Sequence, residues 1–343
     1  MIIPADRCVT RGSYSASGLL PKQTLQLILL RGFSDGDQAI TQMVVVCSST
    51  VETNIRPANQ DPNIHSDESI TFQADVSLTA LTKDIHVFLD NFYRKYGSFI
   101  PLEKSDVLRH LKKKLNVDIS KRKNAIITEV VRYQTAIIQK PVPSFQVIYK
   151  KHTLTLDDLS TLAGQNWLND QVMNMYGDLI MESAHHEIHF LNSFFHRQLM
   201  TKGYDGVKRW TKQVDLFSKS LLLVPIHLEV HWCLVTADFV KKRICLYDSQ
   251  GNALQKVARN ILKYLVAEAK QKQQSAFENG WTVSFDEEIP QQTNENDCGV
   301  FVLEYSRCLA LSKPLQFSQK DIPKIRKRIY KELCDCKLHE EGR

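Results

Sequence analysis

The spacing of apolar residues changes along the chain, and each change predicts a different kind of element. Apolar positions recur at helical spacing from 82 to Gly97 and again over 104–115, so both stretches are predicted helices. Residues 155–183 indicate two more helices, with Thr155 as the cap of the first. Short apolar runs between polar or turn-forming residues then predict strands. These strands are expected at 220–227, 231–238 and 243–251.

Helical spacing returns after the strands. The predicted helices cover 253–272, a segment that begins at Cys298, and 321–334. A group of helices, a set of neighbouring strands and a second group of helices indicate an α+β fold, with a central antiparallel or mixed sheet flanked by helices.

The same patterns divide the chain into three parts. Residues 1–75 show no sustained period and are expected to be mostly disordered. Two prolines in KPVPSF, residues 140–145, interrupt the helical pattern and mark the start of the main domain. We therefore expect a disordered segment over 1–81, a basic helical extension over 82–140 and the main domain over 141–343.

Length and composition are those of an ordinary globular protein, with 343 residues of which 43% are apolar. No run approaches the roughly 18 uninterrupted apolar residues of a membrane span, so we expect no membrane partner. The first residues, MIIPADRCVTRGSY, do not resemble a secretory signal, which favours a reducing compartment. The eight scattered cysteines are then expected to be free thiols.

Charge is distributed unevenly. Residues 101–150 contain eleven Lys and Arg against four Asp and Glu, whereas the whole chain carries a net charge of +6. The runs KKK at 112–114 and KRK at 121–123 fit a nuclear-import signal or a patch for acidic partners. A solvated helix face explains them equally well.

A metal site is not indicated. Cys334 and Cys336, with His339 nearby, have the spacing of a metal-binding fragment but lack a second ligand pair. We expect neither a metal nor an organic cofactor.

Cys298 is the candidate nucleophile. It follows the polar loop QQTNEND and begins the apolar segment CGVFVLEY, where a helix would start. Unpaired N–H groups and the positive end of the helix dipole lower the pKa of a thiol placed there.

The predicted hairpin supplies a candidate base. With the turn at 239–242, antiparallel pairing puts His231 opposite Asp248, close enough for the carboxylate to accept the imidazole N–H. Cys298, His231 and Asp248 would then form a nucleophile, base and orienting acid. His227 is an alternative base, for which a structural role is the plainer interpretation.

An oxyanion formed by attack of the thiolate needs hydrogen-bond donors. The Cys298 backbone N–H is one candidate, and the side-chain amide of Gln292 or of Gln291 is another. Local spacing does not choose between the two glutamines.

Several motifs resemble the sentrin-specific (SUMO-specific) cysteine proteases over about residues 145–338. These motifs are WLND at 167–170, VKRWTKQVDLF at 207–217, VPIHLEVHWCL at 224–234, YDSQG at 247–251 and QQTNENDCGVFV at 291–302. A further likeness, in KYGSFIP and LKKKLNVDIS, extends to about residue 82. The N-terminal 75 residues show no likeness to the long basic extension of such proteases, as expected for a truncated or alternatively spliced start.

The resemblance implies a papain-like fold and assigns roles to individual residues. His231 is the base, Asp248 its orienting acid, Cys298 the nucleophile and Gln292 the oxyanion-hole amide. Two tryptophans and two charged residues are implied in substrate binding. Trp167 and Trp232 would line a channel for a diglycine tail, and Asp170 and Arg209 would contact the folded surface of SUMO. For these four, core aromatics and a surface salt bridge are the competing interpretations.

The implied activity is removal of SUMO from lysine side chains and trimming of SUMO precursors. Paralogues two and three are the implied partners, with a monomeric enzyme, no requirement for nucleic acid, and a nuclear, nucleolar location. The alternatives are the same chemistry on another ubiquitin-like modifier and a non-catalytic SUMO-binding scaffold.

Overall fold

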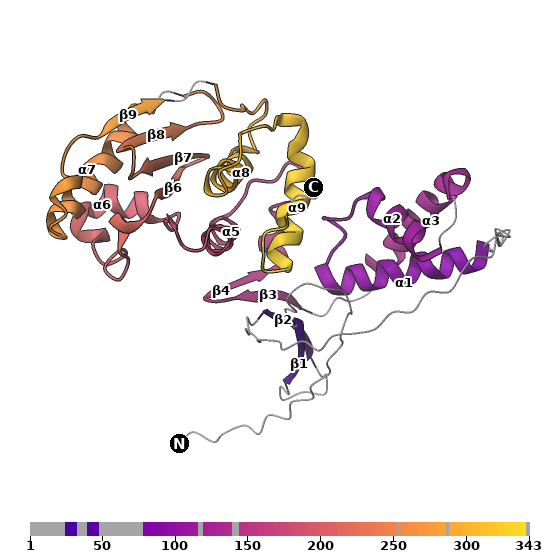
Figure 1. The fold of residues 1–343 in the computed structure, drawn as a ribbon. Coiled ribbons are helices and arrows are strands. Elements are labelled where there is room, and N and C mark those ends of the chain that lie inside the picture. Colours follow the sequence, from indigo (N-terminus) through magenta and orange to yellow (C-terminus); the bar gives the residue numbers. More distant parts are fainter. Residues whose placement is uncertain are drawn as a thin grey trace, which may run out of the picture. The chain divides into compact units, whose positions relative to one another are not determined.

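The computed structural model describes residues 25–32, 40–47, 78–115, 119–138, 144–252, 254–285 and 288–340 (Figure 1). The chain forms two compact units, residues 1–145 and 146–343. The division lies next to the break at Pro141 and Pro143 in the sequence.

Two strands lie in the N-terminal segment that the sequence analysis expects to be mostly disordered. Strands β1 (Leu25–Gly32) and β2 (Ile40–Cys47) pair antiparallel, with Leu25 opposite Cys47. The expectation is therefore wrong for these two stretches, because each is an apolar, strand-forming run long enough to pair with the other. The other residues before 78 lie outside the described part of the chain.

Three helices follow in the first unit. They are α1 (Leu78–Tyr96), α2 (Lys104–Leu115) and α3 (Lys123–Ile138), with a short 3-10 turn, η1 (Ser120–Arg122), before α3. The two helices predicted over 82–97 and 104–115 are confirmed. The third was not predicted separately. Leu89, Leu111 and Ile126, one from each helix, are buried in a shared apolar cluster, so each helix turns its apolar face inward.

The second unit begins with an antiparallel hairpin, β3 (Phe145–Tyr149) and β4 (His152–Thr155). Thr155 then caps α4 (Leu156–Ser160), as predicted. Its hydroxyl accepts from the Asp158 N–H at 3.3 Å, and the Asp158 carboxylate accepts from the Thr155 N–H at 2.8 Å. The longer helix α5 (Asp170–Ser183) follows, capped by Asn169.

A five-stranded sheet occupies the centre of this unit. Its strands are β5 (Ile188–Phe190), β6 (Leu221–Leu228), β7 (His231–Asp238), β8 (Arg243–Tyr247) and β9 (Thr282–Phe285), side by side in this order. The pairs β6–β7 and β7–β8 are antiparallel, whereas the edge strands β5 and β9 pair parallel to their neighbours. The sheet is mixed, in agreement with the predicted α+β class.

Helices cover both faces of the sheet (Figure 1). Helices α6 (Phe195–Val207) and α7 (Gln255–Gln271) pack on one face through a large apolar cluster, and α5 and α8 (Cys298–Ala310) lie on the other. The last helix, α9 (Ile322–Cys334), runs beside α8 and α5. Among the described residues, no helix combines the length and apolar character that a membrane span requires.

Candidate active site

Cys298 is the first residue of α8, directly after Asp297 as the N-cap. The polar loop cannot continue the apolar stripe of the helix, so the helix begins where the sequence turns apolar. Backbone N–H groups of the first helical turn have no partner within the helix, and they surround the sulfur with positive partial charge. The cysteine is 1% exposed, because other side chains cover it.

His231 and Asp248 lie together at the ends of β7 and β8. The imidazole Nε2 contacts the carboxylate Oδ1 at 2.8 Å, and the same oxygen accepts from the Gln250 N–H at 2.9 Å. The other ring nitrogen, Nδ1, is buried and has no hydrogen-bond partner among the residues that the structure describes. With Nε2 held by the acid, Nδ1 is the atom left to serve the thiol.

The environment of His231 favours its charged form. Burial lowers the pKa of the imidazole, but the hydrogen bond that the imidazole donates to Asp248 and the interaction with Cys298 act in the opposite direction and raise that pKa to about 9. An imidazolium beside the sulfur stabilises a thiolate, which is the nucleophilic form of cysteine.

The predicted pairing of His231 with Asp248 is wrong in register. Observed partners such as Val235 and Leu246 have indices that sum to two more than the predicted pairing, so His231 is aligned with Gln250 and not with Asp248. The turn lies at 239–242, as predicted, but its centre is one residue beyond the midpoint of 231 and 248, on which the predicted pairing was based. Residues two apart share a face of the sheet, and Asp248 therefore still reaches His231 diagonally. Strand β8 ends at Tyr247, since Asp248 turns away to bind the imidazole and Gln250.

The structure distinguishes the two candidate glutamines. The Ser249 hydroxyl donates to Gln292 Oε1 at 2.6 Å, and the Gln292 N–H donates to the Ser249 carbonyl at 2.9 Å. Gln292 Nε2 donates to the Asn294 carbonyl at 2.5 Å, which leaves its second N–H for another acceptor. Gln291 is exposed and lies against Gly251 instead.

Two aromatic residues expected to line a channel differ in accessibility. Trp167 is 39% exposed, whereas Trp232 is 1% exposed and stacks on His227 with ring centroids 3.9 Å apart. A Cβ on Gly299 would lie 3.0 Å from Leu168 and 3.3 Å from Trp232, so these groups pack tightly beside the nucleophile. His227 is thus a stacked histidine away from Asp248, as the plainer interpretation expected.

Asp170 and Arg209 lie outside this cluster. Asp170 accepts from the Ser193 hydroxyl at 2.6 Å, and its second oxygen lies 3.9 Å from His227 Nδ1. Arg209 is exposed and forms no ion pair with any residue that the structure describes, so the expected surface salt bridge does not account for it. The structure brings together Cys298, His231 and Asp248 and ties Gln292 to Ser249, the residue after Asp248, whereas Asp170 and Arg209 have none of these contacts.

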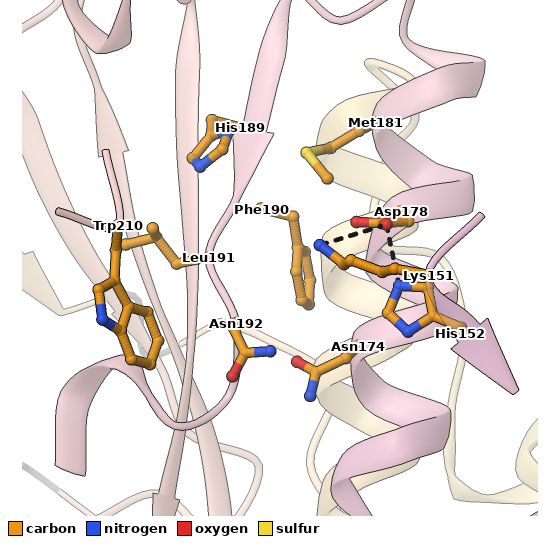
Figure 2. A pocket seen from close by; sticks show the side chains of 10 residues that line it. All are labelled: Lys151, His152, Asn174, Asp178, Met181, His189, Phe190, Leu191, Asn192 and Trp210. Carbon is orange, nitrogen blue, oxygen red and sulfur yellow. Dashed lines mark hydrogen bonds and ion pairs between the residues drawn. The ribbon is translucent and has the colours of Figure 1, made fainter. Parts of the chain in front are cut away.

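A pocket of about 220 Å³ between β5 and α5 adjoins the Arg209 segment (Figure 2). Trp210 lines one side of it, and Asp178, bound to Lys151 and His152, lines the other. None of the four clustered residues lines this pocket, so it is not the reaction centre.

Two residues of the site were missed by sequence reasoning. Ser249, which holds Gln292, directly follows Asp248 in YDSQG and was available as a neighbour of a candidate residue. Arg326 binds Asp297 from α9, and nothing in that basic helix distinguishes it from its neighbours. Cys334, Cys336 and His339 join no group of three metal-ligating side chains in the described part of the chain.

Comparison with known proteins adds independent information. Residues 166–338 match the model of the Ulp1 protease family, C-terminal catalytic domain, and residues 62–155 match a model described as sentrin-specific protease 3/5 N-terminal. Sentrin-specific protease 5 of Mus musculus is 57% identical over 251 residues, which are 73% of this chain and 33% of that protein. Sentrin-specific protease 3 of the same species is 50% identical, over 74% of this chain and 45% of that protein.

The chain thus spans about a third of the length of the sentrin-specific protease 5 relatives. Among solved structures, the C-terminal Ulp1 protease domain in complex with Smt3, the yeast ortholog of SUMO, matches with a TM-score of 0.53 and 27% identity. The match covers 60% of this chain and 93% of that one. The expected family resemblance and fold class are confirmed, and within the family the chain is similar to sentrin-specific proteases 5 and 3.

The pKa of His231 gives a prediction that needs no substrate. Titration of the imidazole, followed by NMR, should show a midpoint near pH 9. Asp248→Asn should move that midpoint down, because the carboxylate no longer opposes the effect of burial. Protonation of His231 also contributes to the stability of the fold. This contribution is present below the ordinary pKa of about 6.5 and is lost as the pH rises through 9. An unchanged midpoint in Asp248→Asn would show that the carboxylate does not control the imidazole.

Proposed function

Because the chain belongs to the Ulp1 protease family, we propose that it is a cysteine protease that removes SUMO from lysine side chains and trims SUMO precursors after the diglycine tail. The observation that carries this proposal is the 2.8 Å contact of His231 with Asp248, in a cluster with a cysteine at a helix N-terminus. The similarity to sentrin-specific proteases and to the Ulp1 domain bound to Smt3 supports SUMO as the substrate.

The proposed reaction begins at the sulfur. The Cys298 thiolate attacks the carbonyl carbon of the last glycine, and the new C–S bond leaves a negative charge on the carbonyl oxygen. The free amide N–H of Gln292 and the Cys298 backbone N–H stabilise this oxyanion. The His231 imidazolium protonates the leaving amine as the C–N bond breaks. Water, deprotonated by the same imidazole, then hydrolyses the thioester.

Substrate binding would use residues around this centre. We propose that Trp167 and Trp232 form walls for the diglycine tail, and that Asp170 and Arg209 contact the folded part of SUMO. The exposure of Trp167 and Arg209 and the absence of an ion pair on Arg209 among the described residues support these roles. Since Trp232 and Cys298 are each 1% exposed, the tail can enter only when the covering side chains move.

We further propose that the enzyme prefers SUMO paralogues two and three. It would act as a monomer and would require no nucleic acid. The likeness to sentrin-specific proteases 5 and 3 supports the preference. All four clustered residues come from one chain, which supports activity as a monomer.

Electrophilic probes test the substrate class. SUMO paralogues and other ubiquitin-like proteins, each ending in diglycine and a cysteine-reactive group, should be compared for labelling of Cys298. We expect labelling by SUMO probes, fastest for paralogues two and three, and complete loss of labelling and of turnover in Cys298→Ser. Labelling by a different modifier would support that modifier as the substrate. Binding of SUMO without any labelling or cleavage would support a scaffold.

Gln292→Ala and Gln291→Ala form a matched pair for the oxyanion role. We expect Gln292→Ala to lower kcat by about 100- to 1,000-fold with little change in KM, because one donor to the oxyanion is lost. Gln291→Ala should stay within about threefold of the parent, since that amide is exposed and lies against Gly251. Equal effects of the two substitutions, measured on a SUMO precursor, would contradict the assignment.

We also propose that the basic end of the three-helix module, where α2 leads to α3, directs the protein to the nucleus and nucleolus. Lys112, Lys113, Lys121 and Lys123 are exposed there, whereas Lys114 pairs with Asp84 at 2.6 Å. Helix α2 buries Val107 and Leu111 inside the module, so the exposed Lys112 and Lys113 can meet an acidic partner or an import receptor.

Exchange of these four exposed lysines for glutamine tests the targeting role. The variant should keep the parent's rate on a soluble SUMO precursor, because none of the proposed site residues lies in the module. Nuclear accumulation of a fluorescent fusion should fall. Exchange of Lys241 and Lys320, two exposed lysines of the second unit, is the control. Unchanged localisation in the four-lysine variant would refute this role.

A further inference from the structure

Arg326 of α9 is 3% exposed and joins two loops that are far apart in the sequence. Its Nη1 donates to the Thr161 carbonyl at 3.1 Å, and its Nη2 to the Asn166 carbonyl at 2.8 Å. Both carbonyls belong to the loop that leads into Trp167. The same guanidinium therefore holds one proposed wall of the channel by its backbone.

The other contacts of Arg326 reach the loop in front of the nucleophile. Nε and Nη2 donate to Asp297 Oδ1 at 2.9 and 2.6 Å, and Nη2 also donates to the Asn296 carbonyl at 3.2 Å. Asp297 is 4% exposed and is the residue before Cys298. Its other oxygen, Oδ2, accepts from Asn294 at 2.7 Å and from Gln319 at 2.6 Å.

We propose that Arg326 is a positioning residue that fixes the Trp167 loop relative to the Cys298 loop, and so sets the geometry between the channel wall and the nucleophile. This inference rests on the proposed function. Arg326 does not touch the reacting atoms; it acts through the two backbone segments that it joins.

The shape of the side chain explains why an arginine is needed. A guanidinium presents five N–H groups in one rigid plane, whereas a lysine presents its donors from a single atom. One ammonium cannot replace a planar fork that reaches three carbonyls and a carboxylate. Replacement of Arg326 by lysine keeps the positive charge but loses the planar group. The ion pair with Asp297 should therefore remain, whereas the contacts with the carbonyl oxygens should loosen.

A purely structural role is the competing explanation, since a buried arginine stabilises any fold in which it is paired. Arg328, two residues later on the same helix, provides the matched control. It pairs with Glu304 of α8 and with Glu332 of α9. Arg326→Lys and Arg328→Lys should therefore both lower stability, but only the first should disturb the two loops.

The experiment compares three readouts in the full chain with these two variants. Hydrogen exchange should speed up over residues 161–168 and 293–298 together in Arg326→Lys, and over neither in Arg328→Lys. Cleavage of a SUMO precursor, corrected for the folded fraction, should fall on the order of 10- to 100-fold in Arg326→Lys, because misplacement by about 1 Å has an effect of this size. Alkylation of Cys298 by iodoacetamide should be unchanged or faster, since the cysteine is 1% exposed and loosening opens access to it.

Gln319→Ala replaces Arg326→Lys as the test variant if Arg326→Lys does not fold. The Gln319 side chain is partly exposed and binds the same carboxylate, so its loss should produce the same pattern at smaller amplitude. Loss of cleavage and of alkylation together, in proportion to lost stability in both arginine variants, would overturn the proposal. So would unchanged exchange in the two loops of Arg326→Lys.

Failure of the proposed function would look different. A parent protein that cleaves no SUMO substrate would refute that function, yet hydrogen exchange in the two loops would still decide whether Arg326 joins them. Faster exchange in both loops of Arg326→Lys would support the proposal that Arg326 joins them. Faster exchange in only one loop would contradict it.

Discussion

The chain's turn at the end of β8 is the constraint on which the rest of the site depends. Within two successive residues, the Asp248 carboxylate fixes the imidazole of His231 and the Ser249 hydroxyl fixes the amide of Gln292. Both residues are almost fully buried, where weak screening by water strengthens hydrogen bonds to a charged group. The imidazole of the candidate base and the amide of the candidate oxyanion donor are thereby both held by one short piece of backbone.

The remaining parts of the site are each attached to the end of a regular element. His231 begins β7, Cys298 begins α8 and Trp167 precedes α5, so rigid strands and helices carry every group except the Gln292 loop. Positions at element ends fix the backbone from which each side chain projects. The excess of basic residues lies in the three-helix module, and none of the clustered residues belongs to that module.

Local patterns in the sequence predicted the features that depend on local interactions. The Thr155 cap, the strand 231–238 and the helix start at Cys298 follow from neighbours within four residues. The turn at 239–242 was predicted, but the pairing of His231 with Asp248 was not centred on it, and this error changed the partner while keeping the face. Arg326 lay beyond prediction, because its five hydrogen bonds join segments about 30 and 160 residues away. The burial of Trp232 likewise depends on α8, which is remote in sequence.

Gly299 has a consequence for how such a site can change over generations. Any side chain there would press on Leu168 and Trp232, which come from two other segments of the chain. A lineage that replaced this glycine would need Leu168 and Trp232 to give way by a few tenths of an ångström, or would have to alter one of those segments, because both side chains belong to a packed interior. Changes at these three separate places in the gene are thus linked, because all three meet at the space that a single methyl group would occupy.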